Sequence, residues 1–258
     1  MSVPSPKFVG VLFDKDGTFV DFDATWGPAT HAIIHALAGG DPALMRAQAE
    51  TLHFLLDEKR FAPTSPLISG SSASYGALWG EALGRSDFAA LKREIDQLAE
   101  IESLKALTPI GEPAAALGAL KAMGLRLGVA TNDTESSARR QIAALGLDEA
   151  IEFVAGYDSG HGAKPDAGMV VAFARQLGVA PRRVAMVGDS RHDLEAARAA
   201  GALAVALLSG PADRAELAPL ADHIVDDIAA LPALFAELNR GRQTDGRQEK
   251  QDASQHQK

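Results

Sequence analysis

Two carboxylates, Asp14 and Asp16, follow an apolar run and precede the pair Gly17-Thr18. Every residue of the run, 8–13, is apolar or glycine, so both faces of an extended chain here would be apolar or small. This pattern is typical of a central strand buried on both sides. Side chains two residues apart in an extended chain point to the same side. A carboxylate at the end of a buried strand is costly unless something pairs with it. The spacing therefore indicates a divalent cation or shared acid–base chemistry, although the pair alone would more often be an ordinary Asp-Gly turn.

Polar residues follow three more predicted strands. They are Thr131 with Asn132, then Lys164, and then Asp189 with Asp193. Because the carboxyl ends of parallel strands meet at one edge of a sheet, we expect these side chains to gather beside the first two carboxylates. Four aspartates with lysine, threonine and asparagine suit phosphoryl transfer with Mg²⁺. Carboxylates hold the hard cation, the other donors neutralise phosphoryl oxygens, and one carboxylate can act as the nucleophile.

Two kinds of pattern divide the chain. From residue 108 to residue 239, short apolar runs alternate with helical periodicity, which predicts an α/β fold with a doubly wound parallel sheet. Residues 24–107 show helical periodicity alone, with helices expected at 25–37, 42–60, 73–83 and 87–107, and residues 19–23 could form a small hairpin or flap. We therefore expect an α/β core of residues 1–19 and 108–239, an inserted all-helical domain of residues 20–107, and a disordered tail of residues 240–258.

Composition narrows the class of protein. The chain has 258 residues, a formal net charge of −9 and no cysteine. The negative charge argues against non-specific binding to nucleic acid, and the lack of cysteine excludes disulfides and thiolate chemistry. No apolar run is long enough to span a bilayer, and residues 1–7 lack the apolar stretch of a signal peptide. We expect a cytoplasmic protein without a membrane or nucleic-acid partner.

The four motifs together resemble those of the haloacid dehalogenase (HAD) superfamily of hydrolases, with a pattern close to that of phosphoglycolate phosphatases. The matching positions are residues 14–18, Thr131, Lys164 before Pro165, and Gly188-Asp189 with Asp193. The motifs stand in the family's order, and the similarity covers about residues 7 to 235. The helical insertion resembles the family's mobile cap of the α-helical type.

The resemblance implies roles for the carboxylates. Asp14 would attack phosphorus and carry the phosphoryl group, and Asp16 would protonate the leaving oxygen and then activate water. Mg²⁺ would be bound by Asp14, by the backbone carbonyl of Asp16 and by Asp189. Asp193 would support the metal site or hold Lys164.

The resemblance also implies a phosphate site. Thr131, Asn132 and the turn at Gly17 would bind phosphoryl oxygens, and Lys164 would balance the charge of phosphate and nucleophile. In the insertion, Arg60 could pair with a substrate carboxylate through its planar guanidinium, unless it only complements the dipole at a helix end.

We therefore expect a Mg²⁺-dependent phosphatase that forms an aspartyl-phosphate and acts on a small phosphorylated metabolite, with 2-phosphoglycolate as the named example. A phosphosugar mutase and a non-catalytic regulatory member stay open as alternatives. A dehalogenase is disfavoured by Asp16, and a phosphonatase would need a lysine from the insertion, for which Lys59 is the candidate. Trp26, Trp79 and Tyr75 are expected to pack within the insertion. The oligomeric state is not predicted.

Overall fold

A six-stranded sheet forms the centre of the computed structural model, which describes residues 7–68 and 70–240. The strand order is β5-β4-β1-β6-β7-β8, and all neighbouring strands in it pair in parallel. The strands are β1 (Gly10–Phe13), β4 (Arg126–Ala130), β5 (Phe153–Ala155), β6 (Val184–Gly188), β7 (Leu203–Leu207) and β8 (His223–Val225). Strand β1 lies between β4 and β6, so the strand that precedes Asp14 is central, as the sequence predicts.

Helices cover both faces of the sheet, and successive side chains of β1 point to opposite faces and so belong to two different apolar clusters. Val11 and Phe13 belong to the cluster that includes residues of α5 (Pro113–Ala122), α6 (Glu135–Ala144) and α10 (Leu231–Arg240). Leu12 belongs to the opposite cluster, with residues of α7 (Gly168–Gln176), α8 (Arg191–Ala200) and α9 (Arg214–Leu217). Two short 3₁₀ turns, η1 (Pro181–Arg183) and η2 (Ile228–Ala230), complete this part. The predicted doubly wound α/β fold is confirmed.

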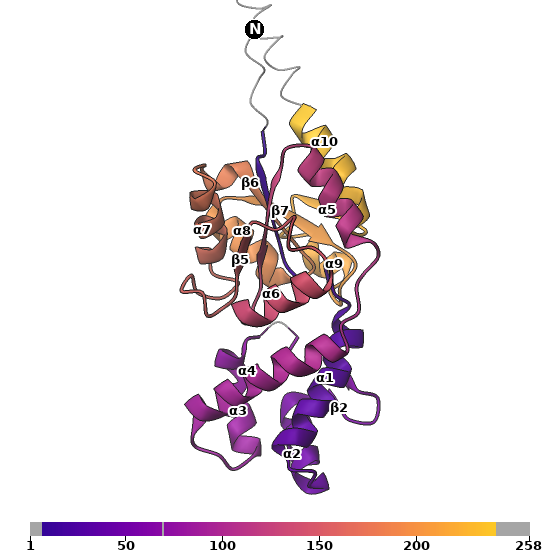
Figure 1. Ribbon diagram of the computed structural model, residues 1–258, viewed down its shortest axis with the longest axis vertical. Coiled ribbons are helices and arrows are strands. Elements are labelled where there is room, and N and C mark those ends of the chain that lie inside the picture. The colour runs from indigo at the N-terminus through magenta and orange to yellow at the C-terminus, as the bar shows by residue number, and fades with distance from the viewer. Residues whose placement is uncertain (1–6, 69, 241–258) are drawn as a thin grey trace, which may run out of the picture.

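Residues 22–105, called the helical segment below, lie between β1 and β4 and form the lower half of Figure 1. Its helices are α1 (Phe22–Leu37), α2 (Pro42–Leu52), α3 (Ser72–Ala82) and α4 (Phe88–Lys105). The segment has an apolar cluster of its own, which includes Ile33, Trp79 and Ile95. The indole of Trp79 donates a hydrogen bond of 2.6 Å to Gln48 inside that cluster. The packing explains why helical periodicity was visible in the sequence of this part.

Local structure differs from expectation in a few places. The helix expected at 42–60 ends at Leu52 because His53 adopts a left-handed conformation with φ of 50°. The chain then forms an antiparallel hairpin of β2 (Phe54–Leu55) and β3 (Arg60–Phe61), whose two-residue strands are too short to show a period of two. The expected hairpin or flap at 19–23 is instead a pair of isolated bridges at Val20, followed directly by α1. Most of the predicted tail, residues 241–258, lies outside the described residues.

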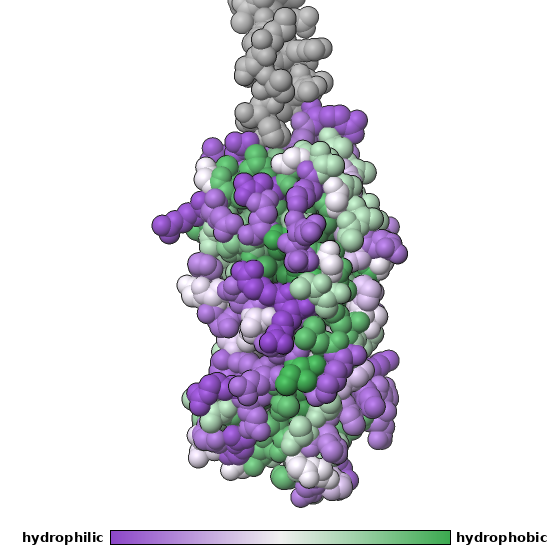
Figure 2. Space-filling view, in the orientation of Figure 1, coloured by the Kyte–Doolittle hydropathy of each residue, from purple (hydrophilic) through white to green (hydrophobic). Residues whose placement is uncertain are grey.

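The visible surface in Figure 2 is mainly hydrophilic, with apolar residues between the polar ones. The large exposed apolar side chains of the described residues include Leu55 on β2, Ile101 on α4 and Val171 on α7. Scattered exposure of this kind is ordinary for a folded protein. Within residues 7–68 and 70–240, no helix has the length and apolar character needed to cross a membrane.

Candidate active site

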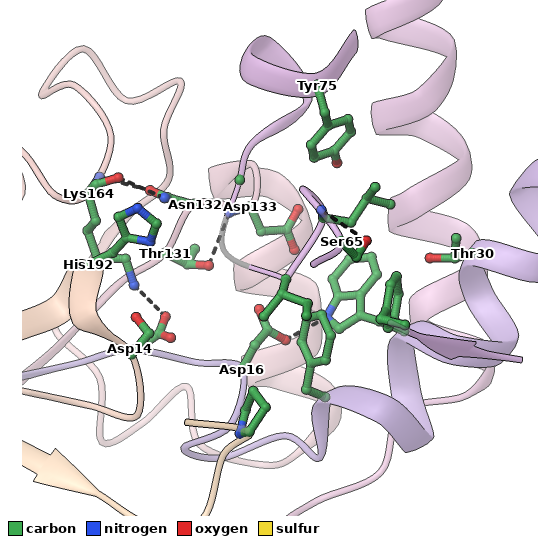
Figure 3. Close-up of a pocket in the computed structure, with 18 of the residues that line it drawn as sticks. Asp14, Asp16, Thr30, Ser65, Tyr75, Thr131, Asn132, Asp133, Lys164 and His192 are labelled. Carbon is green, nitrogen blue, oxygen red and sulfur yellow. Dashed lines mark hydrogen bonds and ion pairs between the residues drawn. The ribbon is translucent and has the colours of Figure 1, made fainter. Parts of the chain in front are cut away.

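A cavity of about 620 Å³ lies between the carboxyl ends of the central strands and the helical segment. Sequence-predicted site residues that line it are Asp14, Asp16, Arg60, Thr131, Asn132, Lys164 and Asp189. Its opposite wall comes from the helical segment and includes Thr30 and Tyr75 (Figure 3). Trp26 of the same segment also lines the cavity. The fold therefore brings motifs from distant parts of the chain to one cavity, as the convergence of parallel strands predicts.

One charged cluster surrounds Asp14, which directly follows β1. Oxygens of Asp14, Asp189 and Asp193 lie within 4.8 Å of one another. The ammonium of Lys164 donates to Asp14 Oδ1 at 2.6 Å and to Asp193 Oδ1 at 2.7 Å. The Asp14–Lys164 contact is drawn in Figure 3. Because all four residues are buried, these charges are poorly screened by water.

The cluster has more negative than positive charge. Burial raises the pKa of Asp14 to about 7, with Asp193 and Asp16 adding to the rise and Lys164 opposing it. Burial and the neighbouring carboxylates Asp14 and Asp193 also raise the pKa of Asp189 well above its usual range. Burial alone would lower the pKa of Lys164, but the carboxylates Asp14 and Asp193 outweigh it and raise this pKa.

These carboxylates are suited to a hard divalent cation. The donor set around Asp14 consists of oxygens alone, which Mg²⁺ prefers, and a bound cation would relieve the repulsion that raises the two pKa values. The carboxylate of Asp16 is not part of this cluster. The predicted role for Asp16 as a metal ligand through its backbone carbonyl stays a prediction.

A second charged cluster surrounds Asp16. The Lys15 ammonium donates to Asp16 Oδ1 at 2.8 Å, to Asp16 Oδ2 at 2.7 Å and to Gln141 Oε1 at 2.8 Å. It also lies 3.5 Å from Asp133 Oδ2. On the other side, the indole of Trp26 donates to Asp16 Oδ1 at 2.6 Å. Burial would lower the pKa of Lys15, but the carboxylates of Asp16 and Asp133 outweigh it and raise this pKa.

Sequence reasoning missed the part that Lys15 and Trp26 play here. Lys15 was within the first motif but had no role assigned, and Trp26 was expected only to pack. The signal for Lys15 was its position, since a lysine at the end of a strand buried on both faces needs a carboxylate partner. Trp26 gave no comparable signal, because its contact with Asp16 depends on how α1 meets the sheet.

Thr131 and Asn132 follow β4 at the edge of the cavity. The hydroxyl of Thr131 accepts a hydrogen bond of 3.1 Å from the Asp133 amide. The side-chain amide of Asn132 donates to the Lys164 carbonyl and accepts from the Lys164 amide, each at 2.9 Å. This side chain therefore holds the backbone of Lys164, which the sequence did not predict.

Gly17 lies in the expected turn, whereas Arg60 lies on a strand and not at a helix end. Gly17 has φ of 73°, its amide donates to the Val20 carbonyl at 2.8 Å, and a Cβ there would collide with the carboxylate of Asp189. Its N–H is thus used in the turn, and the predicted phosphate contact at this turn stays a prediction. Arg60 lies on β3 and not at a helix end; its side chain is 60% exposed, and its Nε lies 3.8 Å from Glu58.

Comparison with known proteins decides the family. A family model described as haloacid dehalogenase-like hydrolase matches residues 8–201. The chain belongs to this family. A phosphoglycolate phosphatase of Rhodospirillum rubrum is 35% identical to this HAD hydrolase over 86% of the chain and 88% of the relative. A phosphoglycolate phosphatase of Chromobacterium violaceum is 32% identical, over 86% of the chain and 93% of the relative.

Solved structures share the fold of this HAD hydrolase. A predicted phosphoglycolate phosphatase from Haemophilus somnus superposes with a TM-score of 0.68 and 21% identity, over 88% of the chain and 98% of the other. A hydrolase from Pseudomonas syringae gives a TM-score of 0.65 and 20% identity, over 89% of this chain and 98% of the Pseudomonas chain. The predicted membership of the HAD superfamily is confirmed, and the family and the two relatives above support a phosphatase enzyme.

Proposed function

We propose that this HAD hydrolase is a Mg²⁺-dependent phosphomonoester hydrolase that forms an aspartyl-phosphate on Asp14. The observation that carries the proposal is the buried cluster of Asp14, Asp189 and Asp193 around the single ammonium of Lys164 at the edge of the cavity. The surplus of negative charge in this cluster favours binding of a divalent cation. Because carboxylates and a phosphate dianion repel one another, the phosphate would bind here only together with such a cation.

The residues divide the reaction into two steps. First, a carboxylate oxygen of Asp14 forms a bond to phosphorus, the bond from phosphorus to the leaving oxygen breaks, and Asp16 gives that oxygen its proton. Asp16 then takes a proton from water, whose oxygen attacks phosphorus and breaks the bond to Asp14. Inorganic phosphate leaves, and both carboxylates return to their starting state.

Other groups bind and balance charge during these steps. Thr131 and Lys164 would contact phosphoryl oxygens, and Asp193 holds Lys164 in place through its ion pair of 2.7 Å. Asp14, Asp189 and the backbone carbonyl of Asp16 would hold Mg²⁺, which would supply positive charge to offset the phosphate dianion.

The helical segment would act as the cap of the α/β core, with residues 20–107 as the cap and residues 1–19 and 108–239 as the core. Its side chains form one wall of the cavity, so seating of the cap over the sheet would exclude water from the reacting groups. The names of the two relatives make 2-phosphoglycolate the first candidate among small phosphorylated metabolites. Arg60, which lines the cavity, would pair with the carboxylate of such a substrate.

Three further observations bear on the proposal. Lys59, the lysine that a phosphonatase would need, is not among the residues that line this cavity. Every motif residue of the proposed chemistry is present, which argues against a non-catalytic regulatory member. The absence of cysteine supports a reducing compartment, and we propose the cytoplasm.

The test is hydrolysis of para-nitrophenyl phosphate and of a panel of phosphorylated metabolites, with and without Mg²⁺. Asp14→Asn should abolish turnover and leave the fold intact, because an amide is not a competent nucleophile. Asp57→Asn, a matched change at an exposed carboxylate of the β2–β3 turn, should keep wild-type activity. Near-normal turnover by Asp14→Asn in Mg²⁺ would refute the covalent mechanism.

A further inference from the structure

The carboxylate of Asp16 accepts three hydrogen bonds from two side chains, Lys15 and Trp26. Oδ1 accepts from Lys15 at 2.8 Å and from Trp26 at 2.6 Å, and Oδ2 accepts from Lys15 at 2.7 Å. A carboxylate offers about four acceptor positions, so these contacts leave one, on Oδ2. Asp16 lines the cavity, where a leaving oxygen would lie (Figure 3).

Lys15 is itself fixed in place. It is fully buried, and its ammonium uses its three hydrogens on the two oxygens of Asp16 and on Gln141. Gln141 in turn donates to Ser103 of α4 at 2.8 Å. Lys15 is not among the residues that line the cavity, so it reaches the substrate only through Asp16.

We propose that Lys15 is a positioning residue that orients Asp16 for proton transfer, with Trp26 completing the arrangement; this inference rests on the proposed function. An N–H donor cannot accept a proton, so the proton that Asp16 transfers is confined to the open position on Oδ2. When that proton passes to the leaving oxygen, the Lys15 ammonium balances the new carboxylate charge where it forms. The same open position then accepts the proton of the attacking water.

Trp26 makes this arrangement depend on the helical segment. It lies on α1, the first helix after the strand and turn that carry Asp14 and Asp16. Because Trp26 lies on α1, its hydrogen bond to Oδ1 depends on the position of α1 relative to the turn that carries Asp16. The acid–base group is therefore fully aligned only when the helical segment covers the cavity.

The experiment compares two substrates with different need for an acid. The para-nitrophenolate of para-nitrophenyl phosphate leaves with little protonation, whereas the alkoxide of an alkyl phosphate needs it. Because kcat/KM covers the steps through departure of the leaving group, Lys15→Met should lower it by about 10–10²-fold for the alkyl phosphate that the wild type hydrolyses fastest. For para-nitrophenyl phosphate, kcat/KM of Lys15→Met should fall by no more than about 3-fold, because departure of para-nitrophenolate uses little of the acid–base contribution. Lys105→Met, at an exposed lysine of α4, serves as the matched control and should change neither value.

A second variant and a double mutant separate positioning from general damage. Trp26→Phe keeps a ring but removes one donor, so it should give a smaller loss in the same direction. It also keeps the test valid if Lys15→Met fails to fold. In the Asp16→Asn background, Lys15→Met should lower kcat/KM for the alkyl phosphate no further, because Lys15 acts through Asp16.

Two results would overturn the inference, and they differ from failure of the proposed function. Equal losses on both substrates, or a full additional loss in the Asp16→Asn background, would mean that Lys15 and Trp26 only stabilise the fold. A wild-type protein that hydrolyses no phosphomonoester in Mg²⁺ would instead refute the proposed function, and the role of Lys15 with it.

Discussion

Replacing Asp14 by asparagine should stabilise the metal-free protein above neutral pH while it abolishes turnover. Burial raises the pKa of Asp14 from 3.8 to about 7. Between these values the folded state holds a proton that the unfolded state has lost, so the free energy of unfolding falls as pH rises through this window. At about 1.4 kcal/mol per pH unit, the fall attributable to Asp14 is about 4 kcal/mol.

Asp14→Asn should recover only part of this free energy of unfolding, because the substitution also changes the contacts of Lys164. Asparagine gives up the ion pair with Lys164, but Lys164 keeps its partner Asp193 at 2.7 Å. The figure of about 4 kcal/mol is therefore an upper limit. For a chain of this size, each kcal/mol corresponds to about 2–4 °C in melting temperature, so a rise of several degrees is expected in EDTA at pH 8.

The assay is thermal unfolding in EDTA at pH 5 and at pH 8, for the wild type, Asp14→Asn and the matched control Asp57→Asn. The wild type and the control should lose stability between the two pH values by more than Asp14→Asn does. Mg²⁺ at pH 8 should restore much of the difference, because it offsets the ionised carboxylates. The reasoning fails if Asp14→Asn shows the same pH dependence as the wild type in EDTA.

Three further predictions concern activity. Asp16→Asn should lower turnover by about 10²–10⁴-fold through loss of acid–base catalysis, and a loss below about 10-fold would remove Asp16 from that role. EDTA should abolish the activity of the wild type, and Asp189→Ala should raise the Mg²⁺ concentration needed for half-maximal rate. Ca²⁺ should inhibit, because its looser coordination disturbs in-line geometry. Full activity in EDTA would contradict this dependence on a metal ion. Arg60→Ala should lower kcat/KM for 2-phosphoglycolate and leave para-nitrophenyl phosphate nearly unchanged, since only the former carries a carboxylate. Equal losses on both substrates would indicate damage to the helical segment, and no loss would exclude Arg60 from substrate binding.

Local patterns predicted the framework of the site. Continuous apolar residues from 8 to 13 predicted a central strand, and β1 is flanked by β4 and β6. Polar residues at the ends of predicted strands were expected to meet, and Asp14, Thr131, Lys164 and Asp189 line one cavity. These inferences depend only on the period of a strand and on the geometry of parallel sheets, both of which are fixed by short stretches of sequence.

The departures from prediction occur where the deciding contact is distant or the element is short. The helix expected at 42–60 ended early because one residue, His53, adopts a left-handed conformation that periodicity does not report. As a result, Arg60 lies on a strand of the β2–β3 hairpin, with Glu58 nearby, instead of at a helix end. Asn132 pairs with the backbone of a residue 32 positions away, which no local pattern could indicate.

The sequence by itself determined the α/β class, the central strand and the identity of the charged residues at its end, because periodicity and residue type are local properties. Only the tertiary structure decided which charges pair. Asp14 and Asp16 are two residues apart, yet Asp14 pairs with Lys164 and Asp16 with Lys15 and Trp26. Buried charges take the partners that the packed fold brings within hydrogen-bond distance, and that distance is set by elements separated by as many as 150 residues.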